Sequence, residues 1–88
     1  MNSYMDTFHS AKIISLTAGT GITRAALTNH KAITITANTT MGITLDFADT
    51  SGTLNTGRIE ILADTHIHLP TRIYGATADA AGSIIIYN

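Results

Sequence analysis

The strongest constraint on the fold is a strict alternation of apolar and polar residues in two neighbouring segments. It runs through residues 32–37, Ala-Ile-Thr-Ile-Thr-Ala, and again through residues 43–47, Ile-Thr-Leu-Asp-Phe. Successive side chains of a strand point to opposite faces, so each segment offers one face to a core and one to solvent. Thirteen Ile and sixteen Thr, both β-branched, favour strands elsewhere in the chain as well. We therefore expect an all-β fold.

Turn-forming residues divide the chain into short strands. Asn38–Gly42 separates the two alternating segments, and we predict that these segments pair as a hairpin. Residues 75–82 are rich in Ala and Gly, which predicts a connection. Further strands are predicted at residues 12–17, 22–27, 59–63, 66–74 and 83–87. About seven short strands at this spacing indicate a small antiparallel β-sandwich or a jelly-roll-like barrel with little helix.

The alternation also predicts the core. Its apolar positions are expected to lie between two packed sheets. They are Ile33, Ile35, Ile43, Leu45, Phe47, Ile59, Ile61, Ile67, Leu69 and Ile73.

Length and charge bound the organisation and the partners. A chain of 88 residues predicts a single β domain, residues 12–88, preceded by an N-terminal arm, residues 1–11. Charged residues make up 12% of the chain, about half the usual ~25%, so we expect part of the surface to face another protein. Five Lys and Arg against six Asp and Glu give no basic stripe, which makes nucleic acid an unexpected partner.

Several function classes have little support. Cysteine is absent, which excludes disulfides and thiolate metal sites. No secretory signal and no apolar run of membrane-spanning length is visible, so we expect a soluble protein made in a cytoplasm without a membrane partner. No Gly-x-Ser-x-Gly elbow exists and no carboxylates are paired by pattern, so we expect no catalytic residues, no cofactor and no enzyme activity.

His66-Ile67-His68 is the sharpest local feature. Residues i and i+2 of a strand share a face, so both imidazoles could ligate a metal if further ligands came from elsewhere, for example from the other chains of a trimer. The alternative is two histidines on a solvent face beside Arg72 and Tyr74, and we expect this alternative. Pro70, in the same segment, marks an edge, a bulge or a break.

Both ends of the chain are candidate interfaces. Met1, Tyr4, Met5 and Phe8 fall at helical spacing and could dock on a neighbour, although a frayed terminus explains the first ten residues equally well. The run Ile84, Ile85, Ile86 and Tyr87 does not alternate, which predicts a strand covered on both faces. Because a small domain supplies little cover, we expect a homo-oligomer, with a trimer favoured.

From Lys31 onward the chain resembles the small β-sandwich structural proteins of tailed bacteriophages. The resemblance rests on the Thr- and Ile-rich stretch of residues 32–47, the stretch of residues 61–75 and the Gly-Ser-Ile-Ile-Ile-Tyr ending. It implies a non-enzymatic capsid decoration (cement) protein that binds the major capsid protein on the virion surface. Two alternatives stay open. One is a trimeric tail-fibre or spike component with a His-x-His metal site; the other is a carbohydrate-binding β-sandwich, for which the scarcity of aromatic residues is unfavourable.

Overall fold

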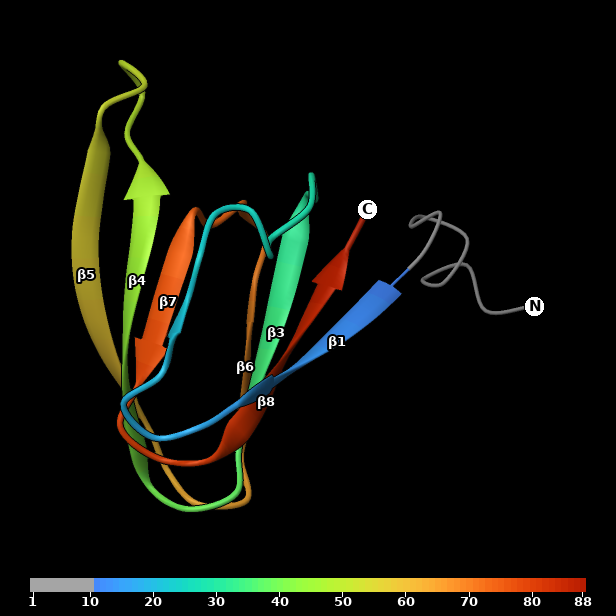
Figure 1. Ribbon diagram of the computed structural model, residues 1–88, viewed down its shortest axis with the longest axis vertical. Helices are drawn as coiled ribbons and strands as arrows, with labels where there is room; N and C mark the ends of the chain where they lie inside the picture. The colour runs from blue at the N-terminus through green and yellow to red at the C-terminus, as the bar shows by residue number, and fades with distance from the viewer. Residues whose placement is uncertain (1–10) are drawn as a thin grey trace.

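Two four-stranded antiparallel sheets pack face to face in the computed structural model, which describes residues 11–88 (Figure 1). The first sheet has the strand order β1-β8-β3-β6 and the second the order β2-β7-β4-β5. No helix occurs in this part of the chain, and hence none that could cross a membrane. The strands are β1 Ala11–Leu16, β2 Gly21–Ile22, β3 Ala32–Ala37, β4 Met41–Ala48, β5 Leu54–Ile61, β6 His66–Leu69, β7 Gly75–Ala78 and β8 Gly82–Tyr87.

The path of the chain is that of a jelly roll. Only β4 and β5 are consecutive strands of one sheet; every other connection between the described strands passes from one sheet to the other. Figure 1 shows four of these crossings gathered at the lower end of the sandwich. The expected all-β, antiparallel sandwich is therefore confirmed, with eight strands in place of about seven.

The predicted hairpin between residues 32–37 and 43–47 is wrong. β3 pairs with β6 and β8, whereas β4 pairs with β5 and β7. The segment Asn38–Gly42 does redirect the chain, but it leads from β3 across the sandwich to β4 in the opposite sheet. Alternation specifies which side chains face inward, and both sheets satisfy that requirement equally well.

Four strands also differ from the prediction. The strand expected at residues 59–63 is β5, which begins earlier, at Leu54, and ends at Ile61. The strand expected at residues 22–27 is only the two residues of β2, because the chain then turns through bonds from Ala26 and Leu27 back to the Thr23 carbonyl. The strand expected at residues 66–74 ends at Leu69, so Pro70 marks a break, and β6 is also an edge strand. The expected connection at residues 75–82 contains β7, whose small Ala76 and Ala78 face the core.

The core lies between the sheets and is made mostly of Ile. Of the predicted core residues, Phe47 is wrong, since it is 37% exposed, while Ile59, Ile67 and Leu69 are only partly buried. Larger side chains that the prediction left out are Leu16, Leu27, Met41, Ile84 and Ile86. The fully buried large residues are Ile33, Ile35, Met41, Ile43, Ile61, Ile73, Ile84 and Ile86.

Candidate functional site

The outer faces of the two sheets carry different chemistry. In β3, the inward positions Ile33 and Ile35 are fully buried, so Thr34 and Thr36 point outward, and the pairing registers extend this assignment across the sheet. We call the resulting surface the uncharged face, because none of its residues is Asp, Glu, Lys or Arg. It consists of Ala11, Ile13 and Ser15 of β1, Ser83, Ile85 and Tyr87 of β8, Ala32, Thr34 and Thr36 of β3, and His66 and His68 of β6. Ala32 and Tyr87 are buried, although they share the outward direction of the others.

Apolar side chains sit at one side of the uncharged face. Ile13 of β1 is 69% exposed and lies opposite the half-buried Ile85 of β8. Tyr87, next along β8 on this face, shares a hydrogen bond with Thr34 at 3.1 Å. Ile13 and Ile85 together leave apolar area in contact with solvent, and this part of the surface is suited to contact with another apolar surface.

The histidines lie on the same face at its other edge. His66 and His68 pair with Thr36 and Thr34 of β3, and Nδ1 of His68 is 2.9 Å from the Thr34 hydroxyl. The His68 ring also contacts Tyr87, with 5.9 Å between ring centroids. They do share a face, as their spacing predicts. Residues 11–88 contain no group of three or more metal-ligating side chains, so a metal here would need ligands from further chains.

The residues of the expected C-terminal interface point to opposite faces of the first sheet. Ile84 and Ile86 are fully buried between the sheets, so the cover for that face comes from the domain itself. Ile85 and Tyr87 point to the opposite side and belong to the uncharged face. Met1, Tyr4, Met5 and Phe8 lie outside the described residues.

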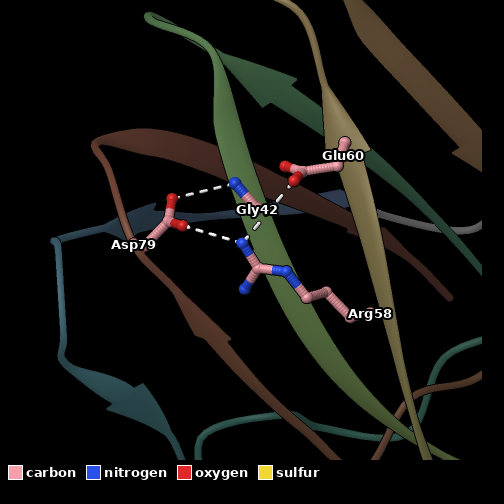
Figure 2. A network of polar contacts seen from close by, with 4 residues as sticks. All are labelled: Gly42, Arg58, Glu60 and Asp79. Carbon is pink, nitrogen blue, oxygen red and sulfur yellow. Dashed lines mark hydrogen bonds and ion pairs between the residues drawn. The ribbon is translucent and has the colours of Figure 1, made fainter.

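The outer face of the second sheet is charged. Its residues include Asp46 of β4 and Arg58 and Glu60 of β5, and Asp79 follows β7. Arg58 donates from Nη2 to Oδ2 of Asp79 at 3.0 Å and lies 3.7 Å from Glu60 (Figure 2). We call this surface the charged face. Its alternating signs keep an outer strand solvated and discourage contact with another sheet edge.

The position of Arg58 depends on Gly42. The backbone N–H of Gly42 donates to Oδ1 of Asp79 at 2.8 Å, and Asp79 returns a bond from its own N–H to the Gly42 carbonyl at 3.0 Å. This Gly42 bond, with the Arg58 guanidinium, lowers the pKa of Asp79. Asp79 and Glu60 in turn raise the pKa of Arg58. The network joins β4, β5 and the β7–β8 connection on one face.

The acidic loop after β4 is a structural turn. Oδ1 of Asp49 accepts bonds from the Ser51 backbone, the Ser51 hydroxyl and the Thr53 backbone, and Oδ2 accepts from Asn55. These bonds, with those from the Ser51 and Asn55 side chains largest, lower the pKa of Asp49. The carboxylate is thus engaged in the turn between β4 and β5.

His30 is the buried polar residue of residues 11–88, and no pattern in the sequence distinguishes it from the other histidines. Its Nδ1 lies 2.7 Å from the Thr28 carbonyl, so it donates there, and Nε2 accepts the Ile73 N–H at 3.0 Å. This pairing requires the neutral tautomer with the proton on Nδ1. His30, Asn29, Lys31 and Asn88 line a shallow hollow of about 130 Å³. That volume is below the ~300 Å³ at which small-molecule sites begin. The hydrogen bonds of His30 instead link two connections of the chain, one at Thr28 and one at Ile73.

Comparison of the chain with protein-family models, with curated proteins and with solved structures gave no match.

Proposed function

We propose that this protein is a non-enzymatic virion structural protein, a capsid decoration (cement) protein that binds the assembled phage shell and stabilises it. The observation that supports the proposal most is the uncharged face, which presents the exposed Ile13 beside Ile85 among Thr and Ser side chains. Jelly rolls recur in viral capsid proteins, and this agreement is one of architecture only.

The difference between the two faces sets the orientation of binding. Docking the uncharged face removes apolar surface from water and desolvates no ion pair, whereas docking the charged face would desolvate Arg58, Glu60 and Asp79. Apolar burial contributes about 25 cal/mol per Å², so contact through the first sheet is favoured. The proposed partner is an uncharged, apolar patch on the outer surface of the major capsid protein.

We expect the protein to act as an oligomer on the shell, with a trimer favoured. A decoration protein engages repeated sites, and weak contacts become strong when one oligomer engages several of them. The native mass of the protein, measured alone and after it has bound the shell, tests whether it is an oligomer. A monomer in both states would remove oligomerisation from the proposal.

The test is co-sedimentation of the purified protein with undecorated, expanded capsids, together with the melting temperature of those capsids. Binding should raise the capsid melting temperature, because a ligand of the assembled state stabilises it by mass action. Few of the contacts are ion pairs, so binding should change little with salt. Failure to bind, with the protein found on the tail by labelled-antibody microscopy, would favour the tail-fibre alternative. Binding in a glycan panel without shell binding would favour the carbohydrate-binding module.

A further inference from the structure

Two arginines from separate connections meet on one aromatic ring. The guanidinium carbon of Arg24 is 4.9 Å from the centroid of the Tyr74 ring, and that of Arg72 is 4.7 Å from the same centroid. Arg24 follows β2, while Arg72 and Tyr74 lie between β6 and β7. Both distances are within the range of a cation–π contact. Both guanidinium groups therefore contact the same ring.

Buried residues hold both connections in position. The connection with Arg24 is anchored by Leu27, which is buried in the core and bonds back to the carbonyls of Thr23 and Arg24. The other connection is anchored by Ile73, whose N–H donates to His30.

The N–H of Tyr74 donates to the Asp46 carbonyl at 2.8 Å, which ties the ring to β4. The arginine pair is thus built into the fold before any ligand arrives, which reduces the ordering cost of binding.

This pair of charges has no counter-charge within residues 11–88. The ion pairs in that part of the chain all belong to Arg58, and neither Arg24 nor Arg72 has a carboxylate within 4.0 Å. The Asp46 carboxylate, near the Tyr74 backbone, accepts a bond from Thr56 instead. Nε of Arg72 is buried and has no hydrogen-bond partner. Both guanidinium groups are strong hydrogen-bond donors, and neither is paired with a carboxylate of residues 11–88.

We propose that Arg24 and Arg72 form a binding site for an oxyanion, that is, a phosphate, sulphate or carboxylate group of a ligand. Guanidinium groups present several donors in a planar fork that matches these anions, and Tyr74 contacts both groups. The site lies in the connections after β2 and β6, outside the uncharged face. It is therefore independent of shell docking, and either proposal can fail without the other.

The test is an NMR titration of the whole protein with sodium phosphate, sodium sulphate and sodium glucuronate, with sodium chloride as the fourth arm, all at constant ionic strength. The readouts are the Nε–Hε signals of the arginines. A saturable shift confined to Arg24 and Arg72 in any of the first three arms supports the site, and the arm with the tightest binding identifies the anionic group. No saturable shift, or the same shift with chloride, overturns the proposal.

Three variants sharpen the result. Arg72→Gln and Arg24→Gln should each weaken binding about tenfold, because a charge-assisted hydrogen bond is lost. Lys12→Gln on β1 makes the same change of charge away from the site and should bind as the unchanged protein does. Equal weakening in all three would show a non-specific charge effect and overturn the proposal. If an arginine variant does not fold, the titration of the unchanged protein still tests whether the anion site exists.

Discussion

The guanidinium of Arg58 occupies the space that a side chain on Gly42 would fill. A Cβ built on Gly42 would collide with Nη2 of Arg58, and from this position the guanidinium reaches Asp79. A side chain at position 42 would therefore displace the flexible Arg58 guanidinium, whereas the backbone angles of Gly42 are ones that other residues adopt. Figure 2 shows the guanidinium passing over the strand at this point.

Gly42→Ala should accordingly lower the melting temperature, because the added methyl group displaces Arg58 from Asp79. The same substitution in an Arg58→Ala background should be neutral or stabilising, since Ala reduces the entropy of the unfolded chain by about 0.4–1 kcal/mol where the backbone permits it. Thermal unfolding of the four proteins in this double-mutant cycle measures the difference. Equal effects of Gly42→Ala in both backgrounds would contradict the assigned contact.

Acid should destabilise the protein through Asp79 and Asp49. The pKa of each is lowered in the folded state from a usual value of 3.8, so each contributes stability that is present above that value and is lost as pH falls through the folded pKa. Urea unfolding from about pH 5 to about pH 2 should show a falling free energy of unfolding. Asp79→Asn and Asp49→Asn should each make the fall shallower. Curves that superimpose on that of the unchanged protein would refute the contribution.

His30→Ala should be strongly destabilising for a histidine outside any active site. It leaves the Ile73 N–H without a partner in the interior, and such an unsatisfied group costs about 1–3 kcal/mol. His66→Ala, at an exposed position, is the matched control and should stay within about 0.5 kcal/mol. Nitrogen-15 spectra should also find the proton of His30 on Nδ1. Equal melting temperatures for both variants would contradict the buried tie.

Ile61→Ala and Phe47→Ala should separate the true core from its edge. Ile61 is 1% exposed, so its truncation should cost about 2–5 kcal/mol. Phe47 is 37% exposed and packs over Gly57, so its truncation should cost about 1 kcal/mol. Urea unfolding compares the two. A larger loss for Phe47→Ala would place the ring in the core after all.

Phe47 also shows how far alternation alone can predict this fold. The alternation correctly predicts that Ile33, Ile35, Ile43 and Leu45 face inward, because side-chain direction is a local property of a strand. Whether position 47 is covered depends on which distant segments of the chain pack over it, and no local pattern contains that information.

The strand pairing could not be read from the sequence for a related reason. β3 and β4 alternate in the same way, but their partners β8 and β5 are chosen by packing across the whole sandwich. β7 was missed because Ala76 and Ala78, small residues with weak strand preference, face a crowded interior.

The candidate surface was only partly predictable. His66 and His68 share a face as their spacing requires, but the contrast between the two outer faces depends on which strands are neighbours. Arg24 and Tyr74 are far apart in sequence and meet only through the fold.

The most direct test of the proposed docking face compares Ile13→Glu with Leu62→Glu in the capsid co-sedimentation assay. The two side chains are equally exposed, at 69% and 68%, but only Ile13 lies on the uncharged face. Each variant places the same charge on the surface, so a general effect of charge would appear in both. We expect Ile13→Glu to abolish shell binding and Leu62→Glu to bind as the unchanged protein does. Undiminished binding by Ile13→Glu would contradict the assignment of the uncharged face as the docking surface.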